Sequence, residues 1–319
     1  MIITNMNKFH SNLLLLRNES TYSKLLLNSF LFASSKSNNT FFAHHHGMLR
    51  RASSPTNFYL NVDERGQHGK SLPHLLDADK LASRYVFHGA HVTPPFDMQA
   101  NMSVPKLDEG EVLVRVRSAT ICLSDIHTVC GSRVEPTPSV LGHEACVEIL
   151  DHRRDDSFQL QVGDRATFSI ADVCGECEYC QNNLSQKCVK LFKYGHATLQ
   201  NGTGFNGCYA SHIVLRKGTT IIKLPDAIND RLGASINCAL ATMVNCVEQI
   251  PWEVKRRANK VLIQGDGMLG LYGIALLKQL GISQVYCCGH QEARREIIKS
   301  FGAIPIINGI IIKQDYLFL

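Results

Sequence analysis

Long hydrophobic runs are the clearest absence in this sequence of 319 residues. No window approaches roughly 18 uninterrupted apolar residues, about what a membrane-spanning helix needs, so we expect no membrane span. Charge is sparse too, at 19% of residues, whereas hydrophobic residues make up 45%. This balance excludes an intrinsically disordered chain and is typical of a globular protein with a real core, long enough for about two domains.

A strong excess of one charge sign is also missing. The net charge is +5, the sequence pI is about 8.6, and much of the excess lies near the N-terminus. A basic surface for phosphate groups is therefore not predicted, and neither is a nucleic-acid partner. Cysteine, in contrast, is abundant: the chain has 12. Their clustering indicates metal ligation in a reducing compartment more than a disulfide framework.

The first 55 residues have a composition of their own. Serine, asparagine and leucine fill a stretch whose single acidic residue is Glu19. Its basic residues are Lys8, Arg17, Lys24, Lys36, Arg50 and Arg51. This composition is typical of a mitochondrial transit peptide, so a mitochondrial protein is one expectation. The alternative is an untranslocated tail of a cytoplasmic protein, or a gene-model artefact. With a polar linker at 56–80, residues 1–80 are predicted to be a disordered extension.

The rest of the chain shows two patterns of secondary structure. Short β-like runs with glycine-rich connections suggest a barrel-like β domain. Its strands are predicted at 111–118, 145–150, 164–169 and 209–215. After residue 231, strands alternate with helices, which predicts the beginning of a parallel α/β sheet. The predicted helices are 232–249, 269–280 and 292–301, and the predicted strands are 261–264, 284–288 and 304–307. The fold class is therefore α/β plus β.

Four cysteines lie close together in CGECEYCQNNLSQKC, residues 174–188. A structural zinc ion is held tetrahedrally by four such donors. Gaps of two residues let Cys174, Cys177 and Cys180 converge on one ion, and Cys188 completes the shell after a longer loop. A ferredoxin-type cluster would have its fourth cysteine after three residues and then a proline, whereas Val189 follows here. Structural zinc is therefore predicted over an iron–sulfur cluster or unpaired loop cysteines.

Three further ligand-type residues are far apart in the chain. Cys122 lies in ATICLSDIHTVCG, His143 in LGHE and Cys238 in INCALAT. Each alone is more readily explained as a core residue, either a small buried hydrophobe or a hydrogen-bonded histidine. Together they supply two thiolates and one imidazole. That is the composition of a catalytic zinc site whose fourth position is open to water or substrate.

A glycine motif follows the predicted strand 261–264. In GDGMLG, Gly265, Gly267 and Gly270 stand where a tight turn leads into an apolar helix, and Met268 and Leu269 begin that helix. In this context the glycines let the backbone approach a pyrophosphate at the helix N-terminus. The motif therefore predicts a dinucleotide site.

The acidic residue expected after this motif is missing. In NAD-binding folds an Asp or Glu at the end of the second strand binds the ribose 2′-hydroxyl. Here that position is Gly289, and His290, Arg294 and Arg295 follow it. Cations without an acid suit a 2′-phosphate better, so NADP is favoured over NAD. The alternative is that these arginines form a solvated helix face.

The ordered set of motifs resembles the zinc-containing medium-chain alcohol dehydrogenase family. The matching parts, over about residues 84–305, are C-x-S-D-x-H from Cys122, GHE around His143, the four-cysteine lobe, Asn237-Cys238 and GDGMLG. The residues of these motifs are most similar to those of the polyol and threonine dehydrogenase side of the family. They are more weakly similar to those of a subgroup associated with phosphonate metabolism. The resemblance implies a GroES-like β-barrel catalytic domain at 81–250 and a partial Rossmann dinucleotide-binding domain at 251–319.

The resemblance also implies how the chemistry is divided. Two zinc ions are expected per chain, the catalytic one acting as a Lewis acid on an alcohol oxygen. Ser124 is expected to take the proton from that oxygen and His127 to pass it to solvent. Asp125 and Glu144 are expected to orient the ligands from behind. The implied activity is hydride transfer from a secondary alcohol or polyol to NADP or NAD, in a protein expected to form a homo-oligomer.

The resemblance to the family ends before the last residue of the chain. Residues 310–319 do not resemble the family, and a full dinucleotide fold has a second βαβαβ half, so a C-terminal truncation is expected. A second hypothesis is therefore an inactive isoform that keeps its zinc sites without transferring hydride. A third, a zinc-ribbon nucleic-acid binder, is disfavoured because Glu176 and Glu178 and only two lysines flank the cysteines.

Overall fold

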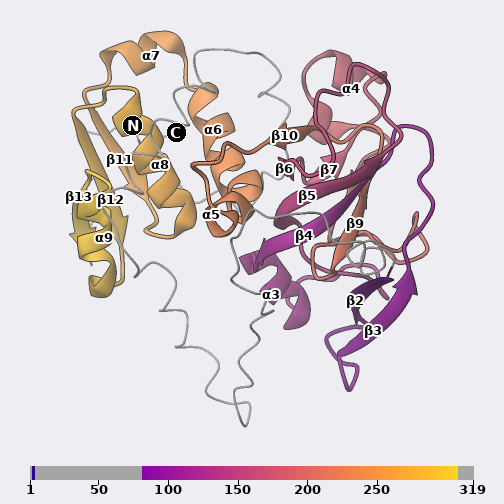
Figure 1. The fold of residues 1–319 in the computed structure, drawn as a ribbon. Helices are drawn as coiled ribbons and strands as arrows, with labels where there is room; N and C mark the ends of the chain where they lie inside the picture. Colours follow the sequence, from indigo (N-terminus) through magenta and orange to yellow (C-terminus); the bar gives the residue numbers. More distant parts are fainter. Residues whose placement is uncertain (1, 4–80, 308–319) are drawn as a thin grey trace.

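The computed structural model describes residues 2–3 and 81–307 of the chain. They form two groups of elements, a β-rich group and a mixed α/β group that follows it in the chain (Figure 1). The predicted extension and linker at 4–80 and the unmatched tail at 308–319 lie outside the described residues. Within the described ranges, no helix is both long enough and apolar enough to cross a membrane.

The β-rich group is built on a five-stranded antiparallel sheet with the order β10-β6-β5-β4-β9. Its strands are β4 (Val112–Thr120), β5 (Glu144–His152), β6 (Arg165–Phe168), β9 (His212–Leu215) and β10 (Ile221–Lys223). The alternation of apolar residues predicted four of these strands, and their apolar side chains form one buried cluster. Within it, the rings of Phe168 and Tyr194 pack edge to face with centroids 5.4 Å apart, a favourable aromatic geometry.

Smaller elements surround this sheet. They are the hairpin β2 (Leu81–Phe87) and β3 (Phe96–Ser103), the short pair β7 (Ala171–Asp172) and β8 (Phe192–Lys193), the helices α3 (Leu123–Val129) and α4 (Glu178–Gln181), and the 3₁₀ turn η2 (Ser185–Lys187). Sequence patterning did not predict the hairpin as a pair of strands. None of the residues of β3 is buried, so this strand lacks the apolar alternation on which such a prediction depends.

The described strands of the barrel-like domain do not form a closed barrel. β9 and β10 are the two edges of the five-stranded sheet, and β2 pairs with β3 in a separate sheet. Outside its pairing with β3, the strand β2 forms two isolated bridges, Arg84 with Ala210 and Phe87 with Ser139. The described β group is therefore an open five-stranded sheet and a separate hairpin, because continuous strand pairing does not extend from the edges of the sheet to the hairpin.

The α/β group contains a parallel four-stranded sheet with the order β1-β11-β12-β13. Its strands are β1 (Ile2–Ile3), β11 (Lys260–Gln264), β12 (Gln284–Gly289) and β13 (Ile304–Ile307), and its helices are α7 (Trp252–Arg257), α8 (Met268–Gln279) and α9 (Arg295–Ser300), with α9 preceded by the 3₁₀ turn η4 (Glu292–Arg294). β11, α8 and β12 form the βαβ unit that the glycine motif predicts, and the Rossmann-like part of the fold is as expected.

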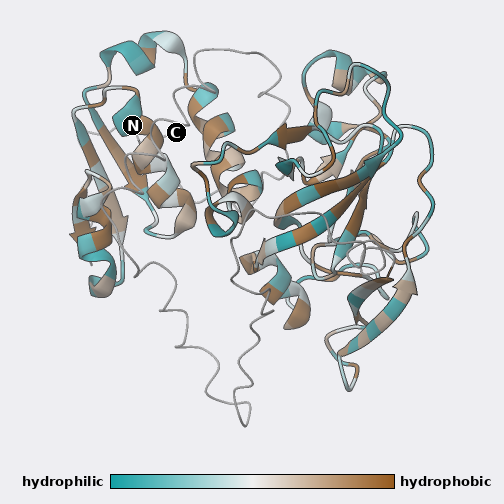
Figure 2. Ribbon diagram, viewed as in Figure 1, coloured by the Kyte–Doolittle hydropathy of each residue, from teal (hydrophilic) through white to brown (hydrophobic). Residues whose placement is uncertain are grey.

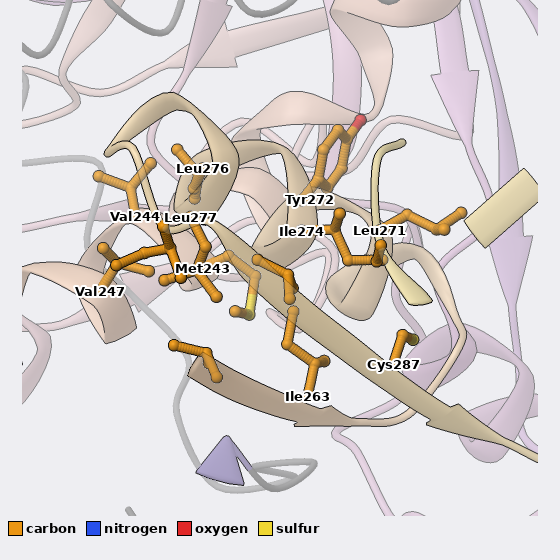
Figure 3. Packing of buried hydrophobic residues seen from close by; sticks show 14 of the residues in the cluster. Met243, Val244, Val247, Ile263, Leu271, Tyr272, Ile274, Leu276, Leu277 and Cys287 are labelled. Atoms are coloured by element: carbon orange, nitrogen blue, oxygen red, sulfur yellow. The ribbon is translucent and has the colours of Figure 1, made fainter. Parts of the chain in front are cut away.

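The main apolar core of the α/β group lies between its helices and the sheet. Figure 3 shows Met243 and Val247 beside Leu277, with Ile263 of β11 beneath them. Ile274 and Leu277 of α8 are almost fully buried. Figure 2 shows the same segregation along the ribbon, where hydrophobic colour is concentrated on α6, α8 and the inner strands. Burial of this kind is the main stabilising contribution to the βαβ unit that would carry a dinucleotide.

The long helix predicted at 232–249 is divided into three pieces. α5 (Asp230–Ala234) is followed by a π-helical segment, η3 (Ile236–Leu240), and then by α6 (Ala241–Glu248). α5 begins where Asn229 accepts a hydrogen bond from the amide of Leu232. Hydrophobic periodicity cannot predict a π-helix, which widens one turn and occurs frequently at functional sites. Here that turn carries Cys238.

Candidate metal centres and dinucleotide loop

The first candidate metal centre is the cysteine lobe on the β-rich group. The Sγ atoms of Cys174, Cys177, Cys180 and Cys188 all lie within 4.8 Å of one another. Local backbone geometry brings them together: Cys177 immediately precedes α4 and Cys188 ends η2. The Sγ atoms of Cys188 and Cys174 are 3.5 Å apart. Four converging sulfurs with no other donor are the ligand set of a structural zinc site.

Backbone amides favour ionised sulfur in this lobe. Hydrogen bonds from the amides of Val189 and Cys180 lower the pKa of the Cys177 thiol to about 6. The amides of Cys174 and Lys190 also point at the Sγ of Cys188, at 3.3 and 3.4 Å. Because zinc binds thiolates rather than thiols, the hydrogen bonds to Cys177 favour its binding to zinc, whereas desolvation raises the pKa of Cys180 to about 12.

The second candidate centre joins three segments that are distant in sequence. Cys122 stands just before α3, His143 and Glu144 at the start of β5, and Cys238 in the π-helical turn. One donor atom from each of these residues lies within 4.8 Å of all the others. His143, Glu144 and Cys238 are buried and Cys122 is partly buried. The structure therefore brings together the cysteine, histidine and cysteine predicted as a group.

Glu144 is closer to this centre than the sequence predicted. It was expected to orient ligands from behind, yet its carboxylate belongs to the same cluster of donor atoms. Its Oε1 lies 4.0 Å from Nε2 of His143. Burial and the neighbouring Cys122 raise its pKa to about 9. Two sulfurs, one nitrogen and one carboxylate oxygen make a chemically suitable set for zinc.

The electrostatics of the second centre favour one thiolate. The hydrogen bond from Cys238 lowers the pKa of Cys122 to about 2, helped by His143. Burial lowers the pKa of His143, but the hydrogen bond with Cys122 and the charge of Asp125 outweigh burial and raise it. A buried cluster of this kind, with pKa values moved apart, is typical of functional sites.

Residues of α3 surround this centre. Asp125 is buried, and its Oδ1 lies 3.7 Å from Nδ1 of His143. Its Oδ2 accepts hydrogen bonds of 3.0 Å from the amide of Cys122 and from the hydroxyl of Tyr209. Asp125 thus connects two of the candidate ligands, the place expected for an orienting residue. Tyr209 was not predicted, and no motif in its neighbourhood indicates this role.

The two residues predicted for proton transfer lie on the same helix with different exposure. The Oγ of Ser124 is buried and contributes to lowering the pKa of Cys122. His127 is exposed on the last turn of α3, where its Nδ1 is 3.1 Å from the Oγ of Ser132. One group therefore lies at the centre and the other at the surface.

A buried histidine that sequence reasoning missed lies beside the second centre. The rings of His143 and His196 are 5.0 Å apart, and Nδ1 of His196 is 3.2 Å from Oε1 of Glu135. Burial lowers the pKa of His196. The hydrogen bond with His196 and the positive charge of its ring lower the pKa of Glu135, although burial opposes them. Neither residue lies in a recognisable motif, so only the folded structure shows the pair.

The glycine loop has the conformation that a dinucleotide requires. Gly265 has a φ of +120°, in the region that favours glycine. A Cβ on Gly270 would lie 2.9 Å from the carbonyl carbon of Gly265 and closer still to its carbonyl oxygen. Only glycine therefore fits at this position in the first turn of α8. A Cβ on Gly267 would meet no atom of the described protein within 4 Å. This open space, at the start of α8 beside Met268 and Leu269, fits a pyrophosphate.

The residues predicted to bind the ribose lie at the end of β12. Gly289 ends this strand, His290 is exposed, and Arg294 donates from Nη1 to the carbonyl oxygen of Asp266 at 2.7 Å. Arg295 pairs with Glu292, with Nη2 2.9 Å from Oε2. The structure thus places the predicted glycines and Arg294 around one loop, whereas Arg295 is held by Glu292 of the preceding 3₁₀ turn.

Comparisons with known proteins agree with this arrangement. The profile of the family described as "Alcohol dehydrogenase GroES-like domain" matches residues 108–226. The chain is 33% identical to a D-arabitol-phosphate dehydrogenase of Enterococcus avium over 228 residues, which is 70% of this chain and 60% of the relative. It is 31% identical to an L-threonine 3-dehydrogenase of Pyrococcus horikoshii over 65% of this chain and 57% of that protein. The chain thus spans about three fifths of the length of these relatives.

Solved structures show the same fold. A crystal structure of an alcohol dehydrogenase from Thermotoga maritima superposes with a TM-score of 0.65 at 26% sequence identity, covering 72% of this chain and 63% of that one. The sequence relatives and this solved structure therefore both support descent from the alcohol dehydrogenases.

Proposed function

The chain belongs to the medium-chain alcohol dehydrogenase family, and we propose that it is a zinc-dependent, NAD(P)-linked dehydrogenase of secondary alcohols or polyols. Two relatives are named as dehydrogenases of arabitol phosphate and of threonine, which are small polar molecules with hydroxyl groups, and this supports the substrate class. The substrate would bind beside Cys122, His143 and Cys238, and the dinucleotide at the loop around Gly265.

One observation carries this proposal. Cys122, His143, Glu144 and Cys238 come from three distant segments, yet their donor atoms lie within 4.8 Å of one another. Such convergence of two thiols, an imidazole and a carboxylate, buried together, has a large desolvation cost without a cation to bind them. The donor set therefore fits zinc, and an ion held by Cys122, His143 and Cys238 would keep its fourth position open to substrate, as a catalytic site requires.

The residues of the chain divide the chemistry as follows. Zinc at this centre supplies a Lewis acid that lowers the pKa of an alcohol, and a bound nicotinamide supplies the hydride acceptor. Ser124 Oγ, buried beside Cys122, is placed to accept the alcohol proton. His127, exposed on the same helix, exchanges protons with solvent. Asp125 holds His143 and Cys122 in position through its two carboxylate oxygens.

The cysteine lobe serves the fold rather than the reaction. Its four sulfurs leave no position of a tetrahedral ion open to substrate. We therefore propose a second, structural zinc ion held by Cys174, Cys177, Cys180 and Cys188. It would fix α4 and η2, two very short elements with little apolar burial of their own.

The test is turnover by the zinc-loaded full chain. Secondary alcohols and polyols are offered with NAD⁺ or NADP⁺, and reduced nicotinamide is followed by absorbance. Cys238→Ser should abolish turnover, whereas Cys130→Ser, an exposed cysteine that belongs to neither cluster, should keep it. Full turnover by Cys238→Ser, or no turnover of any alcohol by a chain that holds both zinc ions, would overturn the proposal.

A further inference from the structure

The end of β12 lacks a carboxylate of its own, but another residue places one there. Gly289 ends the strand where an acidic residue binds the adenosine ribose in NAD-binding folds. The side chain of Asp266, the second residue of GDGMLG, lies over Gly289. A Cβ built on Gly289 would be 2.6 Å from the Cβ of Asp266 and closer still to its carboxylate. The carboxylate therefore fills the space that a strand-end side chain would otherwise occupy.

Neighbouring residues hold Asp266 at this place. Its Oδ2 accepts a long hydrogen bond of 3.4 Å from the amide of Gln291. Arg294 donates to the backbone carbonyl of Asp266 at 2.7 Å and to Oε1 of Gln291 at 3.0 Å. These contacts tie the glycine loop to the segment after β12, so the carboxylate and the end of the strand form one surface.

The two arginines that could receive a 2′-phosphate already have other partners. Arg294 directs its guanidinium to a backbone oxygen and a side-chain amide. Arg295 is paired with Glu292, and His290 is exposed. Within the described residues, no ion pair neutralises the Asp266 carboxylate.

From this juxtaposition we infer that Asp266 replaces the missing strand-end acid and makes the site selective for NAD(H) over NADP(H). The inference rests on the proposed function, in that it assigns the nucleotide of the same site. A carboxylate accepts a hydrogen bond from a ribose hydroxyl and repels a phosphate, which carries close to two negative charges. It reverses the expectation of NADP drawn from the sequence, because the acid comes from the glycine loop and not from the second strand.

Probes of the adenosine half test the inference without requiring the nicotinamide half of the site. The zinc-loaded full chain is titrated by calorimetry with ADP-ribose and with 2′-phospho-ADP-ribose. ADP-ribose should bind more tightly by about tenfold or more, corresponding to about 1.4 kcal/mol. Asp266→Asn keeps the size and removes the charge, and it should reduce this preference below about threefold. The control Glu296→Gln removes a carboxylate that pairs with Lys299 on α9 and should leave the preference unchanged.

A second variant approaches the same point from the strand. Gly289→Ala should push the Asp266 carboxylate aside and weaken the preference, while circular dichroism checks that the variant folds. Tighter binding of the 2′-phosphorylated probe, or an unchanged preference in Asp266→Asn, would overturn the inference. Absence of binding by either probe would overturn it together with the nucleotide site. Selective binding of ADP-ribose by a chain that oxidises no alcohol would support the inference while the proposed function fails.

Discussion

Asn237 donates a buried hydrogen bond of 2.9 Å from its side-chain amide to the backbone carbonyl oxygen of His143. The same amide donates to the carbonyl of Phe168 at 3.1 Å, so one side chain joins the π-helical turn to β5 and to the end of β6. Because Cys238 follows Asn237 directly, this bond sets the distance between two candidate zinc ligands. The geometry of the second centre therefore depends on a residue that does not bind the metal.

Replacement of Asn237 with alanine should loosen the second centre selectively. We expect the affinity of that centre for zinc to fall by about 10- to 100-fold, as for other residues that orient metal ligands. Competition with a chelator measures this affinity, and zinc retained by the cysteine lobe is the internal control. Equal loss from both centres would indicate a general folding defect instead of a positioning role.

The cysteine lobe gives a prediction about metal content and stability. Cys180→Ser should lower the zinc content from two ions to one per chain, since three sulfurs no longer close the tetrahedral shell. The apparent melting temperature should fall with it. Elemental analysis and calorimetry measure the two effects, and Cys130→Ser serves as the matched control. A Cys180→Ser protein that keeps two tightly bound ions would contradict the assignment of the lobe.

An ion-pair network around Asp230 joins α5 to strands β4 and β6 of the β-rich group. Its carboxylate accepts hydrogen bonds of 2.8 Å from both Arg117 and Arg165. These two arginines lower the pKa of Asp230, although partial burial opposes them. The ionised carboxylate of Asp230 therefore stabilises the fold above the unfolded-state pKa of about 3.9. This stabilisation is lost as the pH falls through the lower folded-state pKa.

Asp230→Asn should lower the free energy of unfolding at pH 7 by about 1 kcal/mol, because solvent screens these partly exposed ion pairs. The difference from the unmodified protein should shrink as the pH falls below about 4. Urea unfolding at several pH values measures it. A difference that stays constant down to the most acidic pH would show that the carboxylate charge is not responsible.

His212 predicts a separate acid sensitivity. Burial in β9, with the charge of Arg115 nearby, lowers its pKa to about 4, against about 6.5 in the unfolded chain. Its stabilising effect is complete above about pH 6.5 and is lost between 6.5 and about 4, because the unfolded chain binds the proton first. We expect a loss of about 1–2 kcal/mol after allowance for screening.

The measurement is the slope of unfolding free energy against pH. His212→Gln should flatten this slope between pH 6.5 and 4, whereas His91→Gln, at an exposed position, should not change it. Equal slopes in the unmodified protein and His212→Gln would assign the acid sensitivity to other groups.

Local patterns predicted the elements that depend on local sequence. The strand at 261–264, the helix at 269–280 and the strand at 284–288 differ from β11, α8 and β12 by one residue at most at each end. Apolar runs and the glycine turn determine these elements directly. The cysteine lobe could be predicted for the same reason, since its four sulfurs lie in one short loop segment.

What could not be predicted depends on contacts between distant residues. Cys122, His143 and Cys238 could be grouped by their ligand chemistry and by family resemblance, but no spacing in the sequence shows that they lie together. The π-helical turn, the ligand-range position of Glu144 and the placement of Asp266 over Gly289 follow from tertiary packing. Gly289, the position counted for the missing acid, does end β12, and the residue proposed to replace that acid comes from another segment.

X-ray absorption at the zinc edge, with zinc content determined on the same sample, tests the central claim most directly. Four sulfurs in the lobe and two in the second centre predict two zinc ions per chain and a mean of three sulfur ligands per zinc. Nitrogen and oxygen ligands should account for the remainder, with zinc–sulfur distances of about 2.3 Å. A single zinc ion per chain with four sulfur ligands would contradict the account, because the cluster of Cys122, His143, Glu144 and Cys238 would then hold no metal.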